Sequence, residues 1–160
     1  IRIAGDDLTA DIMEYMRHQH NIKIGERTAE EIKINVGSAL SQLDNPPADY
    51  VIQGPNQMTA LPIEVPVSYQ EISHCLEKSI NKIETAILSA LEQTPPELYA
   101  DIVARGIWLA GGGALLRGLA KRFTDKINIQ FHVAEDPLRA VARGTGIALK
   151  NVNKFSFLIR

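Results

Sequence analysis

Residues Trp108-Leu-Ala-Gly-Gly-Gly-Ala-Leu-Leu-Arg-Gly-Leu119 form the most informative stretch of this 160-residue chain. The apolar run 107–110 predicts a short buried strand, and residues 114–122 predict a helix directly after the three glycines. Glycine lets the backbone approach a flat or anionic ligand closely, and the start of a helix offers free N–H groups. The glycines alone support a ligand-binding turn and a plain strand–helix turn about equally.

This glycine-rich turn differs from two common phosphate-binding motifs. No Gly-Lys-Ser or Gly-Lys-Thr follows the glycines, so the turn is not a Walker loop. Counting from Gly111, the last position of a Gly-x-Gly-x-x-Gly motif is Leu116, so the turn does not match the dinucleotide-binding fingerprint either.

The segments around the turn predict an α/β layer. Residues 129–133 read as a second strand, and Asp136-Pro137 begins a helix that extends to about Lys150. A long helix over about 69–93 follows the capping box Ser68-Tyr-Gln-Glu71. The order strand–helix–strand–helix predicts parallel strands joined by right-handed crossovers.

The N-terminal part of the chain predicts a smaller lobe. A helix over about 7–20 is followed by a helix over 28–40, which the capping box Thr28-Ala-Glu-Glu31 opens. Strands at 49–53 and 61–67 follow, with a turn signal at Gly54-Pro-Asn56 between them. We therefore expect two units: a larger one formed by residues 1–20 and 68–160, and an inserted α+β lobe formed by residues 21–67.

Composition excludes several classes of protein. Apolar residues make up 45% and charged residues 22%, with a net charge of −2, so nucleic-acid binding is not expected. The single cysteine, Cys75, excludes an intramolecular disulfide and a cysteine zinc cluster and suits a reducing cytosol. The four histidines are scattered, so we expect no metal site. No apolar run has the length of about 18 residues that spans a bilayer, and no secretory signal is present.

A second candidate site lies in the inserted lobe. Glu30 and Lys33 are three residues apart on the predicted helix and share a face. The carboxylate could accept hydrogen bonds from ribose hydroxyls, while the lysine stem could cover a base and its ammonium could donate. The alternative is a solvated ion pair worth a few tenths of a kcal/mol. No Ser-His-Asp or paired-carboxylate arrangement is present, so no catalytic residue is expected in this chain.

Four blocks of the sequence together resemble one family. They are Gly25–Lys33, Glu92–Leu98, Arg105–Leu119 and Ala134–Gly146. In this order they are similar to the MreB family of bacterial actin homologues, and the similarity extends from Gly5 to about Leu149. Four blocks in the right order are far more specific than any one motif. The tail 151–160 has no clear period and no counterpart that we can place.

The resemblance implies the second half of an actin-like ATPase, with a ribonuclease H-like larger subdomain and a small inserted subdomain. The adenosine of ATP would lie between the two. The resemblance implies nucleotide contacts from the insert helix and from the glycine-rich turn, namely Glu30, Glu31, Ile32, Lys33, Gly111, Gly112, Gly113, Ala114 and Leu115. Relatives often have a glutamate where this chain has Asn35, so the role of that position is open.

The resemblance also implies a function for the intact protein. It would bind ATP with magnesium, form filaments whose assembly is coupled to ATP hydrolysis, maintain rod shape and guide cell-wall synthesis. Its partners would be further copies of itself and other proteins of cell shape and wall synthesis. The filaments would be cytoplasmic and associated with the membrane through the other half of the protein.

The chain begins at Ile1 without a methionine, so we expect a piece of a longer protein. The phosphate loop and the catalytic groups of such ATPases would lie outside it. We therefore expect this chain to fold, to hold no nucleotide tightly and to hydrolyse no ATP. The alternatives are half of an Hsp70-like chaperone, half of a sugar or acetate kinase, which share this fold, or a pure binding module.

Overall fold

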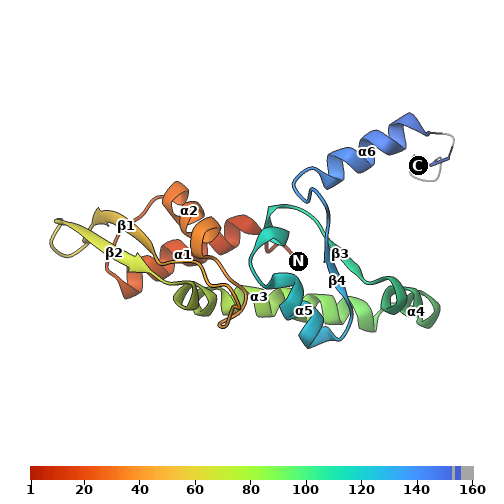
Figure 1. Cartoon of the computed structure of the whole chain (residues 1–160), viewed down its shortest axis with the longest axis horizontal. Coiled ribbons are helices and arrows are strands. Elements are labelled where there is room, and N and C mark those ends of the chain that lie inside the picture. Colours follow the sequence, from red (N-terminus) through yellow and green to blue (C-terminus); the bar gives the residue numbers. More distant parts are fainter. Residues whose placement is uncertain (153, 156–160) are drawn as a thin grey trace.

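The computed structural model describes residues 1–152, 154 and 155. The elements form an elongated body, with a β-hairpin at one end and helix α6 extending from the other (Figure 1). In chain order the elements are α1 (Gly5–Gln19), α2 (Glu26–Val36), β1 (Tyr50–Pro55), β2 (Pro62–Val67), α3 (Tyr69–Glu92), α4 (Pro96–Arg105), β3 (Ile107–Leu109), the 3-10 helix η1 (Gly112–Leu115), α5 (Leu119–Ile127), β4 (Phe131–Val133) and α6 (Ala140–Lys150). Within the described residues, no helix is long and apolar enough to cross a membrane.

Helix α3 connects the two ends of the body. Its 24 residues give it a length of about 36 Å, and it runs from α1 and α2 to α5 (Figure 1). The stripe Ile72, Leu76 and Ile80 is fully buried and shares one core cluster with Ile12 of α1 and Ile32 of α2. One continuous core therefore joins these helices. Since it does not separate residues 21–67 from the rest of the chain, the division into a larger unit and an inserted lobe stays a prediction.

Strands β1 and β2 form an antiparallel hairpin in which Tyr50 pairs with Val67. The turn expected at residues 54–56 is misplaced, since the first two of these residues belong to β1. Asn56 starts the turn instead. Its Oδ1 accepts hydrogen bonds from the backbone N–H groups of Met58 at 2.8 Å and Thr59 at 3.1 Å.

Strands β3 and β4 form a parallel pair, as the sequence predicts, with Trp108 opposite His132. The expectation that β3 is fully buried is wrong. Trp108 is 67% exposed and stacks on His132, with ring centroids 5.0 Å apart. A short apolar run indicates hydrophobicity, but it does not show that both faces of the strand are covered.

The helix expected over residues 114–122 is also wrong, because the chain breaks there into two short helices. Leu116 is extended, and Gly118 has a φ of +74°. Between them, Arg117 forms a parallel bridge with Ser38, which follows α2. This pairing straightens the chain after η1, so α5 begins only at Leu119.

Helix starts follow the predicted signals in one of three cases. Ser68 accepts a hydrogen bond from the Glu71 N–H at 3.3 Å and caps α3 as expected. The start predicted at Asp136-Pro137 is wrong, because residues 136–139 form a bend and a turn and α6 begins only at Ala140. The capping box predicted at Thr28 is wrong, because α2 begins two residues earlier, after Gly25.

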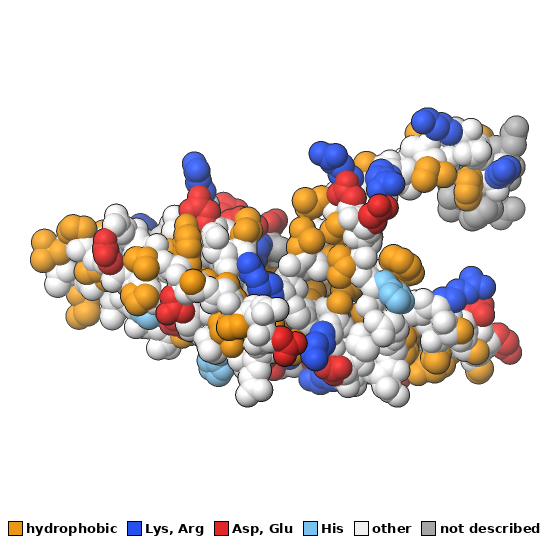
Figure 2. Space-filling model, viewed as in Figure 1, with side chains coloured by type: hydrophobic (Ala, Val, Ile, Leu, Met, Phe, Trp, Pro, Cys, Tyr) orange, Lys and Arg blue, Asp and Glu red, His pale blue; other side chains and the backbone are white. Residues whose placement is uncertain are grey.

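Helix α6 lies apart from the rest of the body (Figure 1). None of its residues is buried, and Val141 and Leu149 are 76% and 67% exposed. Hydrophobic side chains are visible along it in Figure 2. Of the tail that follows, residues 153 and 156–160 lie outside the described residues.

Candidate nucleoside site

A cavity of about 550 Å³ lies between α2 and the glycine-rich turn. Two motifs nearly 80 residues apart therefore face the same space, which confirms the prediction that they share one cleft. The predicted site residues that line it are Glu30, Lys33, Gly112, Gly113 and Leu115.

The other four predicted site residues lie elsewhere. Ile32 is fully buried in the core, and Ala114 is 7% exposed. Glu31 pairs with Arg27, with 3.2 Å between Oε1 and Nε. Gly111 donates its N–H to the carbonyl of Pro137 at 2.7 Å. Contact of these four with a nucleotide stays a prediction.

The ammonium of Lys33 is held by three groups on one side of the cavity. Its Nζ lies 2.6 Å from Oε2 of Glu30 and donates to the carbonyl of Gly5 and to Oγ1 of Thr9, both at 2.9 Å. The side chain of Lys33 is only 14% exposed. The methylene stem of Lys33, rather than its charge, is therefore what this residue offers to the cavity.

Glu30 is fixed from two sides. Besides Lys33, the hydroxyl of Thr9 lies 2.7 Å from its Oε2. Hydrogen bonding from Lys33 lowers the pKa of this carboxyl below its ordinary value of 4.5, against the opposing effect of burial. Glu30 is thus a carboxylate at neutral pH, and its Oε1 has no hydrogen-bond partner among the described residues.

The glycine-rich turn presents backbone to the cavity. A Cβ added at Gly113 would meet no protein atom within 4 Å, whereas one at Gly112 would lie 3.4 Å from Leu138 Cδ2. Both residues open the 3-10 helix η1, where N–H groups lack partners within the helix. The turn therefore offers open space and hydrogen-bond donors at the same place.

Sequence reasoning missed seven residues that also line the cavity. They are Gly5, Asp6, Leu8, Ile34, Leu116, Arg117 and Leu138. Of the two aspartates after Gly5, Asp7 accepts a hydrogen bond from the Ala4 N–H at 2.8 Å, whereas Asp6 lines the cavity. Thr9 lies one helical turn after Gly5, and helical periodicity would have placed both on one face.

The cavity fits a nucleoside in size and in chemistry. Its volume lies within the range of small-molecule sites. Ile34, Leu115 and Leu138 offer apolar surface for a base, and Glu30 offers an acceptor for a ribose hydroxyl. No group of three His, Cys, Asp or Glu side chains that could hold a metal occurs in the described part of the chain.

Comparison with known proteins shows the family and the fold of the chain. A sequence profile of the MreB/Mbl protein family matches residues 1–157, so the match continues into the tail for which the sequence alone gave no counterpart. The cell shape-determining protein MreB of Escherichia coli is 41% identical over 157 residues, which are 96% of this chain and 44% of that protein.

Solved structures are similar over most of the chain. MreB5 of Spiroplasma citri, crystallised with ADP, superimposes with a TM-score of 0.91 at 38% identity, covering 96% of this chain and 46% of that one. The MamK double helical filament has a TM-score of 0.68 at 18% identity over 86% of this chain and 42% of that one, which shows a shared fold. The chain spans about half the length of the relatives it matches. It has the actin-like fold of these proteins and belongs to the MreB/Mbl family.

Proposed function

We propose that the cavity between α2 and η1 holds the adenosine part of an adenine nucleotide. The observation that supports this most strongly is the meeting of Glu30 and Lys33 with the glycine-rich turn around one space of about 550 Å³. The ADP bound to MreB5, a relative with the same fold, supports the choice of nucleotide.

Each wall has a distinct role in this proposal. Oε1 of Glu30 accepts a hydrogen bond from a ribose hydroxyl, while Thr9 and Lys33 hold Oε2 in place. The stem of Lys33 covers one face of the base. The backbone of Gly112 and Gly113 lies close to the nucleotide on the opposite side, because no side chain intervenes there.

The two-unit organisation follows from the same proposal. Residues 1–20 and 68–160 form the larger subdomain, residues 21–67 form the inserted one, and the nucleoside lies between them. The cavity combines residues of α1, α2 and η1, as such an arrangement requires.

For the whole protein we propose an ATP-binding, filament-forming role in bacterial cell shape. The name of the Escherichia coli relative and the MamK filament support this role. ATP would bind with magnesium, and hydrolysis would be coupled to assembly. Wall-synthesis proteins would be partners, and membrane contact would use parts outside this chain. The family match favours this role over that of a chaperone or a small-molecule kinase.

The test is titration of the purified chain with adenosine and with ATP. Amide NMR signals of Gly112 and Gly113 report the site, and calorimetry gives the affinity. We expect both ligands to bind weakly and about equally, in the high-micromolar range or worse, because the cavity walls suit the nucleoside and offer few charge-assisted bonds to a triphosphate. Phosphate release should not exceed that of buffer, since phosphoryl transfer depends on a held metal ion and a positioned nucleophile.

A matched pair of variants localises the binding. Gly113→Val should abolish adenosine binding without unfolding the chain, because the added side chain projects into space that no protein atom occupies. Gly144→Val, on the distant helix α6 with equally open surroundings, should bind like the original chain. Unmoved amide signals at millimolar adenosine, or undiminished binding by Gly113→Val, would contradict the proposal.

A further inference from the structure

Arg117 is bonded to both walls of the cavity. It follows Leu116, the residue that caps η1, so its backbone belongs to the glycine-rich wall. Its Nη1 donates to the carbonyls of Ile34 at 2.9 Å and Gly37 at 3.3 Å, at the end of α2. Its own carbonyl accepts the N–H of Ala39 at 2.8 Å.

These bonds use groups that a helix end leaves available. The last carbonyls of α2 have no partner within the helix, and they form the negative end of its dipole. A guanidinium at this position is therefore favoured both as a donor and as a charge. The side chain of Arg117 thus fixes α2 through its C-terminal turn, the turn that follows Lys33.

The segment after α2 and the segment after η1 approach each other closely, and neither Gly37 nor Gly118 has room for a side chain. A Cβ at Gly37 would lie 3.0 Å from Leu116 Cδ1 and 2.2 Å from the carbonyl oxygen of Lys33. A Cβ at Gly118 would lie 2.7 Å from Leu40 Cδ1. Because the packing is close on both sides of Arg117, a small shift of one segment against the other moves α2 relative to η1.

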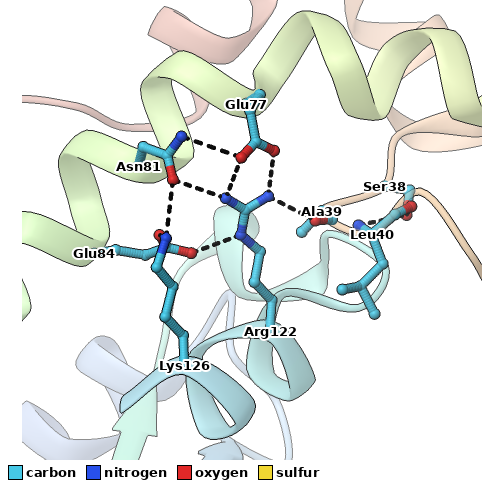
Figure 3. Close-up of polar contacts among 8 residues, drawn as sticks. All are labelled: Ser38, Ala39, Leu40, Glu77, Asn81, Glu84, Arg122 and Lys126. Atoms are coloured by element: carbon cyan, nitrogen blue, oxygen red, sulfur yellow. Dashed lines mark hydrogen bonds and ion pairs between the residues drawn. The ribbon is translucent and has the colours of Figure 1, made fainter.

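Arg122 of α5 also binds the segment that follows α2 (Figure 3). Its Nη1 donates to the carbonyl of Ala39 at 3.0 Å, and Glu77 and Glu84 of α3 bind the remaining guanidinium groups. The segment after α2 is thereby anchored to α3. Through its backbone bond to Ala39, Arg117 connects this anchored segment with the glycine-rich wall of the cavity.

We propose that Arg117 is a positioning residue that sets the separation of α2 and η1, and with it the width of the nucleoside cavity. This inference rests on the proposed function. Arg117 acts through the carbonyls of α2 and places Glu30 and Lys33 opposite Gly112 and Gly113.

The experiment measures the separation and the binding independently. Spin labels at Glu26→Cys and Lys121→Cys, both exposed, in a Cys75→Ser background report the distance from α2 to α5. Adenosine affinity is taken from the Gly112 and Gly113 amide signals. Arg117→Met removes the donors but keeps the length of the stem, and Arg117→Lys restores a charged donor. Arg27→Met, an exposed arginine on the same helix, is the control.

We expect Arg117→Met to lengthen and broaden the label distance. It should also weaken adenosine binding about tenfold, because Glu30 and Lys33 are then no longer held in place opposite Gly112 and Gly113. Arg117→Lys should recover most of both, and Arg27→Met should change neither. An unchanged distance and affinity in Arg117→Met would overturn the inference even if the melting temperature fell.

Two further outcomes remain decisive. If the original chain binds no adenosine, the proposed function fails, and the label distance in Arg117→Met and its recovery in Arg117→Lys still decide the positioning role. If Arg117→Met does not fold, Arg117→Gln, whose amide is too short to reach both carbonyls, replaces it with the same expected outcomes.

Discussion

The guanidinium of Arg122 lies against the buried carboxylate of Glu84, with 2.6 Å between Nε and Oε1 (Figure 3). The two side chains are 12% and 2% exposed. Glu84 also lies 2.6 Å from Lys126 Nζ, and Arg122 also binds Glu77. This charge network joins α3 to α5 and leaves Glu84 dependent on its partners, since an unpaired buried charge is costly.

Removing the arginine of this network should destabilise the fold strongly. We expect Arg122→Met to lower the free energy of unfolding by about 3 kcal/mol, because it leaves Glu84 buried beside Lys126 alone. Urea denaturation measures the change. Arg27→Met breaks an exposed ion pair and should cost no more than about 0.5 kcal/mol. Equal losses in the two variants would refute the distinction.

The hydroxyl of Thr9 should matter more than its methyl group. Thr9 is 3% exposed, and its Oγ1 bonds with Glu30 and Lys33. Thr9→Val keeps the shape and removes these bonds, at a cost of about 2 kcal/mol of unfolding free energy. Thr9→Ser keeps the hydroxyl and should cost about 1 kcal/mol. If chemical denaturation ranks serine below valine, packing of the methyl group stabilises the fold more than the hydrogen bonds do.

Acid should weaken the fold through two carboxylates. Hydrogen bonds from Lys33 and from Arg122 lower the pKa values of Glu30 and Glu77, respectively, below 4.5. A lowered pKa stabilises the fold above the unfolded value and loses that stabilisation as the pH falls through the folded value. The unfolding free energy should therefore decrease between about pH 5 and pH 3. Denaturation curves of Glu30→Gln and Glu77→Gln should each show a shallower decrease, and an unchanged slope in both would contradict this.

Cys75 should be unreactive in the folded chain. Burial, followed by the charges of Asp11 and Glu71, raises the pKa of its thiol to about 12. Because only the thiolate is nucleophilic, alkylation by iodoacetamide at about pH 8 should be about a thousandfold slower than for a free cysteine. Mass spectrometry with and without urea measures this. Labelling of the folded chain at the rate of the unfolded one would show that the thiol is accessible and ionised.

Much of the fold could be predicted because it depends on local patterns. The buried stripe of α3 repeats at helical spacing, and the Ser68 cap is encoded within four residues. The parallel pairing of β3 and β4 follows from their connection through α5. The shared cavity was predicted from two motifs that suit opposite faces of a nucleoside.

The errors occur where distant residues compete with local signals. Glu31, the carboxylate of the capping box predicted at Thr28, accepts a hydrogen bond from the Tyr50 hydroxyl at 3.4 Å instead. The helix predicted over 114–122 breaks because Arg117 pairs with Ser38. Neither Tyr50 nor Ser38 lies within a sequence window of helical length around its partner, so sequence reasoning missed both contacts.

The contact between the segment after α2 and the segment after η1 also affects the order in which parts of the chain fold during synthesis. The bond from Arg117 to Ile34 joins residues 83 positions apart, whereas α1 and α2 can pack as soon as both have emerged. Contacts of such long range form late, because closing the intervening loop costs entropy before any contact repays it. We therefore expect the ribosome-bound chain to acquire the α1–α2 pair first and the cavity last, only after residue 117 has left the exit tunnel.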